Sequence, residues 1–116
     1  MVPGLPMTIL AATVLIAVDP VPTFNVEPSC RHVVAKTAPL GRMEACLSNE
    51  REARDQLLRE WPQFTRVEKS ECVELQHLAG EPSYVALLSC LELRRDARIL
   101  QHQNEREAAA FGGRGR

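Results

Sequence analysis

A chain of 116 residues holds one domain at most, and a domain of this size buries so little surface that cross-links or a metal often reinforce it. The apolar fraction of 45% argues against disorder throughout, and the net charge of −1 argues against general binding of nucleic acid. The charge is uneven, because residues 94–116 carry six basic and three acidic side chains, whereas residues 1–93 carry eight basic and twelve acidic ones.

The N-terminal segment 1–18 contains no charged side chain and indicates export. Its apolar run, Thr8–Val18, has the length of the apolar part of a signal peptide and is short for a bilayer span of about 20 residues. The segment lacks Lys and Arg, and Leu15 is large for the −3 position of a cleavage site at Ala17, so cleavage stays open. Two alternatives also stay open: a core strand or helix at the N-terminus, and an uncleaved membrane anchor from Leu5 to Val18.

Residues 19–29 contain three prolines, which are the main feature of this stretch. Proline lacks an amide donor and fixes φ, so we expect an extended linker between the leader and the body.

Two helices open the body. The first is expected over residues 30–38, before Pro39–Gly41, and the second runs from about Met43 to Trp61, where Pro62 stops it. The second helix has one apolar face and one face with opposite charges four residues apart. The apolar face comprises Cys46, Ala53, Leu57, Trp61 and then Phe64, and the pairs on the solvated side are Glu50/Arg54, Arg51/Asp55 and Asp55/Arg59.

The next helix has the clearest start signal in the chain, a capping box at residues 65–68. The Thr65 hydroxyl can accept from the Glu68 amide while the Glu68 side chain accepts from the Thr65 amide. We expect this helix to turn Cys72, Leu75 and Leu78 inward. Gly80 suits the position after its last turn, because glycine accepts positive φ.

Pro82 suits the first position of a final helix, where its missing amide donor costs nothing. Apolar residues cover most of the circumference of this helix, which predicts that Tyr84–Leu93 is the central element of the core. After Leu100 the apolar pattern decays, so we expect the helical domain to span residues 30–102 and residues 103–116 to form a flexible basic tail. The two apolar stripes are Tyr84, Leu87, Leu88 and Leu91, and Ala86, Cys90, Leu93 and Ala97.

Four cysteines, Cys30, Cys46, Cys72 and Cys90, are the one group that carries chemistry. An even number in a short exported chain predicts a disulfide framework. A hairpin at Gly80 favours pairing Cys72 with Cys90, and the preceding turn favours Cys30 with Cys46, although crossed pairings stay open. The gaps of 15, 25 and 17 residues contain no C-x(2–4)-C knuckle, so we expect no metal site.

No motif indicates catalysis or a cofactor, and we expect neither. The chain lacks G-x-S-x-G, a Gly-rich phosphate loop, an EF-hand and H-E-x-x-H. The three histidines, His32, His77 and His102, share no spacing that would bring them to one metal ion. Glu71 and Glu74 lack the cleft that a general acid/base pair needs. Trp61 and Phe64 are interpreted as core anchors rather than as a ligand cage.

Several short stretches together resemble a known group of proteins. They are Ala53-Arg54-Asp55-Gln56-Leu57, Trp61-Pro62-Gln63-Phe64, then Cys72, Pro82-Ser83-Tyr84-Val85 and Leu88-Ser89-Cys90-Leu91-Glu92. Over residues 30–98 the chain is similar to small exported four-cysteine proteins of alphaproteobacteria that have no assigned activity. The resemblance implies export and a helical cysteine-containing domain, and it implies nothing about mechanism.

The sequence therefore predicts an all-α fold, a small bundle of three to four short helices stapled by disulfides. We expect an exported, non-enzymatic binding or accessory protein of the cell envelope, periplasmic or secreted, with an unknown protein partner. The alternative is a membrane-anchored small subunit of a larger envelope complex, held by the segment from Leu5 to Val18.

Overall fold

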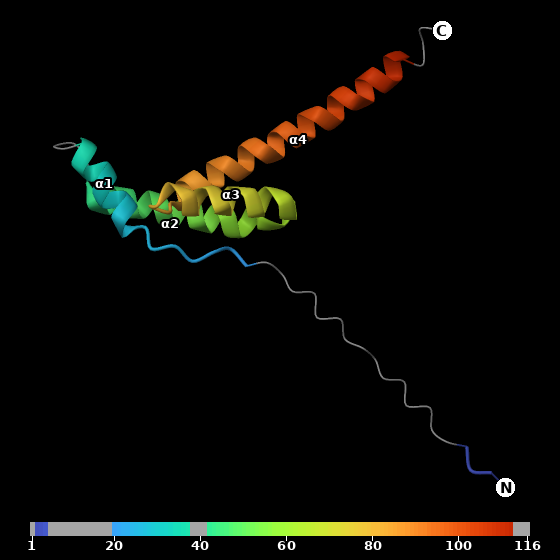
Figure 1. Cartoon of the computed structure of the whole chain (residues 1–116), viewed down its shortest axis with the longest axis horizontal. Helices are drawn as coiled ribbons and strands as arrows, with labels where there is room; N and C mark the ends of the chain where they lie inside the picture. Colours follow the sequence, from blue (N-terminus) through green and yellow to red (C-terminus); the bar gives the residue numbers. More distant parts are fainter. Residues whose placement is uncertain (1, 5–19, 38–41, 113–116) are drawn as a thin grey trace.

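The computed structural model describes residues 2–4, 20–37 and 42–112, and within these ranges every regular element is a helix. The predicted all-α bundle with two disulfides is confirmed. The predicted leader or anchor from Leu5 to Val18 and the turn at Pro39–Gly41 lie outside the described residues. The elements in chain order are α1 (Glu27–Thr37), α2 (Met43–Glu60), the 3-10 turn η1 (Trp61–Gln63), α3 (Arg66–Ala79) and α4 (Tyr84–Gly112) (Figure 1).

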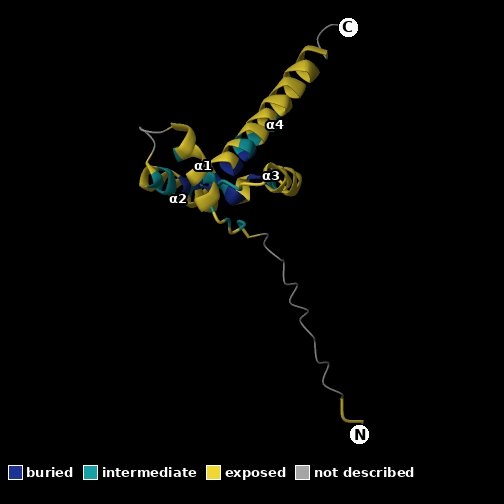
Figure 2. Cartoon of the chain, turned by 60° about the vertical axis from the view of Figure 1, so that its left-hand side comes forward, coloured by how far each residue is buried: buried dark blue, intermediate teal, exposed yellow. Residues whose placement is uncertain are grey.

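The core lies where α2, η1 and α3 pack against the first half of α4 (Figure 2). The apolar face predicted for α2 is buried except at Cys46, which is half-buried. Pro62 lies in η1, directly after α2 ends, as predicted. Most of the core side chains are aliphatic or aromatic, so burial of apolar surface holds the helices together. The core comprises Ala53, Leu57, Trp61, Phe64, Cys72, Tyr84, Leu87, Leu88 and Leu91.

The capping box at the start of α3 is confirmed. Thr65 Oγ1 accepts from the Glu68 amide at 3.1 Å, and Glu68 Oε1 accepts from the Thr65 amide at 2.9 Å. Gly80 ends the helix with φ of 81°, a conformation that favours glycine because a side chain would be strained there.

The face that α3 turns inward differs from the prediction. Cys72 is buried as expected, but Leu75 and Leu78 are 47% and 76% exposed. The buried positions are Glu68, Cys72 and Gln76, at four-residue intervals along the helix. Glu68 and Gln76 can be buried because each has a hydrogen-bond partner, Arg98 in α4 for Glu68 and the Ser83 amide for Gln76. The apolar pattern alone therefore predicted the wrong inward face of α3.

The final helix begins at Tyr84 rather than at Pro82, and Ser83 is its N-cap. Ser83 Oγ accepts from the Ala86 amide at 3.2 Å, and the Ser83 carbonyl accepts from the Leu87 amide at 3.0 Å. The predicted central role of Tyr84–Leu93 holds for the first apolar stripe, which is buried. Of the second stripe, only Cys90 packs against the core, since Ala86, Leu93 and Ala97 are exposed.

The predicted end of the helical domain at residue 102 is wrong, because α4 continues to Gly112. Residues 101–112 are exposed along their whole length, so no apolar period marks them as helix. Their composition does, since Gln, Glu, Arg and Ala are good helix formers and no glycine or proline interrupts them before Gly112. Only residues 113–116 of the predicted tail lie beyond α4, and they are outside the described residues.

Of the linker predicted at residues 19–29, the described residues 20–29 are instead part of the folded body. Its last residues open α1, where Pro28 is tolerated in the first turn because that amide needs no helical partner. Residues 20–26, called here the strap, run extended along the body, and Val21, Phe24 and Val26 pack against the core (Figure 1).

Both disulfides have the favoured pairing. Cys30–Cys46 joins α1 to the start of α2 with a Cα–Cα distance of 5.6 Å, and Cys72–Cys90 joins α3 to α4 with a Cα–Cα distance of 5.8 Å. The hairpin that turns at Gly80 is therefore closed covalently across its two helices.

Candidate functional site

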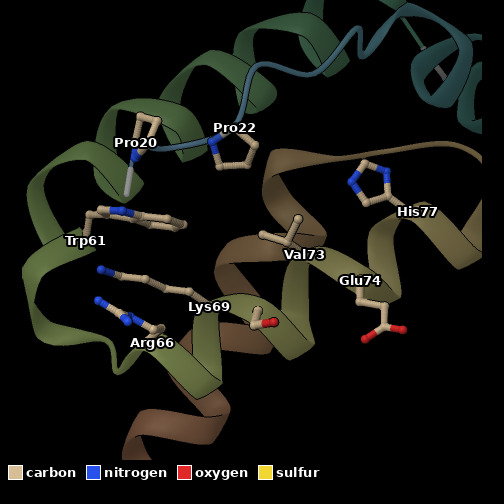
Figure 3. A pocket seen from close by; sticks show the side chains of 9 residues that line it. Pro20, Pro22, Trp61, Arg66, Lys69, Val73, Glu74 and His77 are labelled. Carbon is tan, nitrogen blue, oxygen red and sulfur yellow. The ribbon is translucent and has the colours of Figure 1, made fainter. Parts of the chain in front are cut away.

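An open groove lies between the strap and α3, with a volume of about 460 Å³ (Figure 3). It is lined by residues from three separate elements. The strap supplies one wall, η1 supplies an aromatic ring, and α3 supplies the other wall. The lining residues are Pro20, Pro22, Trp61, Arg66, Lys69, Ser70, Val73, Glu74 and His77.

Tyr84 holds the strap in place and so shapes the groove. Its hydroxyl accepts from the Phe24 amide at 2.7 Å and donates to the Pro22 carbonyl at 3.0 Å. The rings of Phe24 and Tyr84 lie 5.0 Å apart between centroids. These contacts tie the strap to Tyr84, which is only 4% exposed and belongs to the core, so the core holds the strap wall of the groove.

Trp61 forms the inner end of the groove. Figure 3 shows Pro20 on one face of its ring and Lys69 on the other, and Lys69 Nζ lies 4.8 Å from the ring centroid. Trp61 is only 6% exposed and meets Phe64 edge to face at 6.5 Å. The interpretation of Trp61 and Phe64 as core anchors is therefore confirmed, and Trp61 in addition presents its edge to the groove.

The wall that α3 contributes is predominantly basic. Arg66 and Lys69 lie one turn apart in the first turns of α3, where the helix dipole adds partial positive charge. In the described part of the chain neither side chain forms an ion pair with a carboxylate. His77 and Glu74 lie farther along α3, so the groove is most positive at its Trp61 end (Figure 3).

The histidines and glutamates that the sequence singled out do not converge. His32 on α1 faces Glu81, His102 on α4 faces Glu105, and His77 lines the groove. Glu71 pairs with Arg94 of α4, and no group of three metal-ligating side chains forms among the described residues. The expectation of no enzyme activity and no cofactor stays a prediction.

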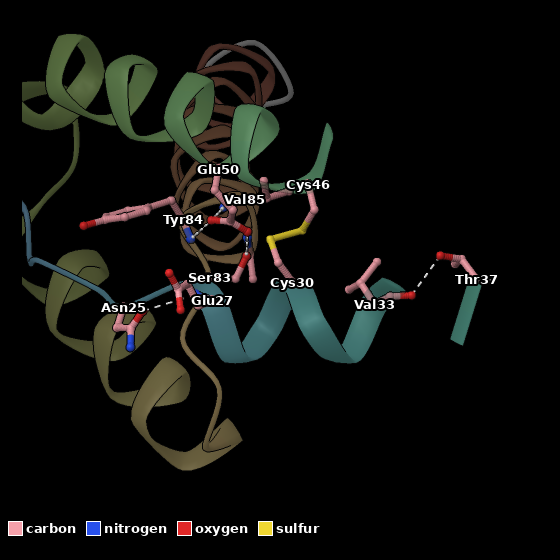
Figure 4. Close-up of a disulfide and its surroundings, with 11 residues drawn as sticks. Asn25, Glu27, Cys30, Val33, Thr37, Cys46, Glu50, Ser83, Tyr84 and Val85 are labelled. Carbon is pink, nitrogen blue, oxygen red and sulfur yellow. Dashed lines mark hydrogen bonds between the residues drawn. A yellow bond between two sulfur atoms is a disulfide. The ribbon is translucent and has the colours of Figure 1, made fainter. Parts of the chain in front are cut away.

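Sequence reasoning missed two buried polar side chains that contact the start of α4, Glu50 on α2 and Gln76 on α3. Glu50 Oε1 accepts from Ser83 Oγ at 2.6 Å, and Glu50 Oε2 accepts from the Tyr84 amide at 2.6 Å and from the Val85 amide at 3.4 Å (Figure 4). Gln76 Oε1 accepts from the Ser83 amide at 3.1 Å.

The placement of Glu50 corrects its assignment to the solvated side of α2, since the residue is 4% exposed. A carboxylate at a helix N-terminus satisfies amides that have no helical partner and interacts favourably with the dipole. Glu50 lies one turn after Cys46, so the Cys30–Cys46 disulfide fixes α1 beside the same cluster (Figure 4). Of the residues in this cluster, only Ser83 could be recognised from the local sequence, as the N-cap of α4. Glu50 could not, because its partners Ser83 and Tyr84 are more than thirty residues away in the sequence.

Two arginines of α4 join it to the corner between α2 and α3. Arg95 donates to Glu60 at 2.8 Å and lies over the Phe64 ring, and Arg98 donates to Glu68 at 3.1 Å. Burial raises the pKa of Glu68, but hydrogen bonds from Arg98 and the Thr65 backbone, together with the Arg98 charge, outweigh it and hold the pKa below 4.5. The capping box is therefore also the point where α4 is held electrostatically.

No protein-family model, curated protein sequence or solved structure matches this chain significantly. The resemblance to exported alphaproteobacterial proteins therefore stays a prediction. No helix in the described ranges is both long and apolar enough to cross a membrane.

Proposed function

We propose that this chain is an exported, non-enzymatic binding protein of the cell envelope, and that the groove between the strap and α3 binds an acidic, partly apolar segment of a partner protein. The observation that carries the proposal is the pair of cations, Arg66 and Lys69, which line the groove without a carboxylate partner in the described chain. Val73 and Pro22 add apolar surface beside them.

The compartment is supported by covalent chemistry. All four cysteines are paired in two disulfides, which form and persist in oxidising compartments and are rare in the reducing cytosol. Together with the apolar N-terminal run, this supports a periplasmic or secreted location. The intact mass of the protein from its native cells tests the route: loss of about eighteen residues fits a cleaved signal peptide. Retention of the full mass in the membrane fraction fits the anchored alternative.

The groove favours an extended segment over a compact small molecule. It is open along its length, its strap wall is extended, and its charge is concentrated at one end. A carboxylate near Arg66 and Lys69 gains charge-assisted hydrogen bonds, while an aliphatic side chain covers Val73. Glu74, nearer the other end, disfavours a segment that is acidic throughout.

Binding is testable with a defined probe, because Trp61 is the chain's single tryptophan and lines the groove. The probe is the peptide acetyl-Glu-Asp-Leu-Pro-Leu-amide, followed by Trp61 emission and by calorimetry. Its amide counterpart, with Gln and Asn in place of Glu and Asp, is the control ligand. We expect saturable binding of the acidic peptide that weakens with added salt.

A charge-matched pair of variants locates the site. Arg66→Gln/Lys69→Gln should weaken binding of the acidic peptide about tenfold, because it removes two charge contacts. Arg51→Gln/Arg54→Gln lowers the net charge equally on the exposed side of α2 and should bind like the wild type. Equal loss in both variants, or equal affinity for the two peptides, would contradict the proposal.

A further inference from the structure

The end of α4, residues 101–112, extends away from the body (Figure 1). Within the described ranges, Arg98 is the last residue of α4 with a hydrogen bond to another element, and residues 101–112 are all exposed (Figures 1 and 2). A helical stretch of this length is marginal in water on its own, because most helix stability in proteins comes from packing one face against another element. This end of α4 therefore has the form of a contact element.

One side of α4 carries five residues at spacings of four, three, four and seven, and Glu107 lies at the intervening position between Asn104 and Phe111. With 100° per residue, Leu93, Ala97, Leu100, Asn104 and Phe111 lie within about 60° of one another around the helix. Leu93, Leu100 and Phe111 are 72%, 57% and 75% exposed. The series, called here the α4 stripe, has the heptad pattern of a coiled coil, with the leucines at d and the other three at a.

We propose that the α4 stripe pairs with the α4 stripe of a second copy of this chain, as a parallel two-helix coiled coil. The stripe is complementary to itself, because the amide of Asn104 both donates and accepts and can pair with the same residue across a twofold axis. A single asparagine at an a position is a known determinant of parallel pairing and register.

The flanking positions permit this pairing. In parallel register each g residue faces the next e residue of the other copy, which places Asp96 opposite Gln101 and Gln103 opposite Ala108. Neither pair brings like charges together. Glu107 occupies the remaining d position and would face Glu107 of the second copy. Repulsion between these two charges keeps the association weak.

The position of the body also permits it. The core-facing residues of α4, such as Leu87 and Leu91, lie on average about 160° around the helix from the stripe. Two copies joined along their stripes therefore hold their bodies on opposite outer sides. Such a dimer presents two strap grooves at once, although the pairing does not depend on what the grooves bind.

Neighbouring positions on α4 give a matched test by sedimentation velocity up to millimolar concentration. Leu100 lies on the stripe, whereas Ile99 lies off it, and they are 57% and 44% exposed. We expect the wild type and Ile99→Glu to dimerise and Leu100→Glu to remain monomeric. Glu107→Leu should tighten the dimer at least about tenfold, because it replaces facing charges with buried leucines.

Cross-linking decides the register. Oxidation of Asn104→Cys should give a covalent dimer, whereas His102→Cys, on the opposite side of the helix, should not, with both native disulfides confirmed by peptide mapping. If the wild type and the Glu107→Leu variant both stay monomeric up to millimolar concentration, the proposal is overturned. Equal dimerisation of Leu100→Glu and Ile99→Glu, or equal cross-linking at 104 and 102, would overturn it as well.

Discussion

The two halves of α4 are parts of one continuous helix but are stabilised by different interactions. The first half packs against α2 and α3, is bonded to Cys72 through Cys90, and is capped by Glu50. The second half is held by its own backbone and by local pairs such as Gln101 with Glu105. Contacts between residues distant in sequence stabilise the body, whereas the helix propensity of its residues stabilises the distal part of α4. A substitution or truncation should therefore change the stability of the body and of the distal helix by different amounts.

Removal of the hairpin disulfide should have the largest effect on the body. The double variant Cys72→Ser/Cys90→Ser opens a loop with a sequence separation of 18, and closing a loop of this length contributes about 3 kcal/mol to stability. Urea unfolding followed by Trp61 emission measures the loss. A free energy of unfolding equal to that of the wild type would show that the α3–α4 contacts alone hold the hairpin.

Removal of the buried carboxylate should have a similar but somewhat smaller effect. Glu50→Ala leaves the Ser83 hydroxyl and the Tyr84 amide without their acceptor and should cost about 2–3 kcal/mol. Glu52→Ala, on an exposed position of the same helix, is the control and should be nearly neutral. If the two variants unfold at the same urea concentration, Glu50 does not cap α4.

Acid should weaken the corner between α3 and α4 through Glu68. The folded pKa of Glu68 lies below its ordinary value of 4.5, so its contribution to stability is present above that pH and is lost as the pH falls through the folded pKa. Glu68→Gln keeps an acceptor for the Thr65 amide but removes the charge. The difference in unfolding free energy between wild type and Glu68→Gln should shrink between pH 6 and pH 3. If the difference in unfolding free energy between the wild type and Glu68→Gln grows toward low pH, the pKa of Glu68 is not lowered in the folded protein.

Removal of the distal helix should have the smallest effect on the body. A chain that ends at Leu100 keeps every core residue, both disulfides and the Arg95 and Arg98 contacts. At concentrations where the chain is monomeric, its body should unfold at the same temperature as the full chain. A clear drop in that temperature would mean that residues 101–116 support the body after all.

The sequence predicted what is encoded locally. The capping box at Thr65, the stop at Pro62, the glycine at the end of α3 and the apolar face of α2 all follow from short-range patterns. The favoured cysteine pairing also followed, because each pair joins two helices that are consecutive in the sequence, α1 with α2 and α3 with α4.

What the sequence did not predict depends on distant partners. Nothing near Glu50 signals that it meets Ser83 and Tyr84, and nothing near Gln76 signals that it replaces Leu75 and Leu78 as the inward residue. The groove was missed for the same reason, because its walls come from the strap, η1 and α3. The length of α4 was missed because an exposed helix needs no apolar period.

Amide hydrogen exchange at several protein concentrations tests the contrast between the two regions most directly. Amides of α2, α3 and the first half of α4 should be protected to the level of global unfolding at every concentration. Amides of residues 101–112 should exchange rapidly in dilute protein and become protected as the concentration rises, because pairing of the α4 stripes packs this half of the helix. If the amides of residues 101–112 are as protected as those of the body in dilute protein, the distal part of α4 is not stabilised separately from the body. If their protection never changes with protein concentration, the α4 stripes do not pair. Either result would contradict the contrast drawn between the two halves of α4.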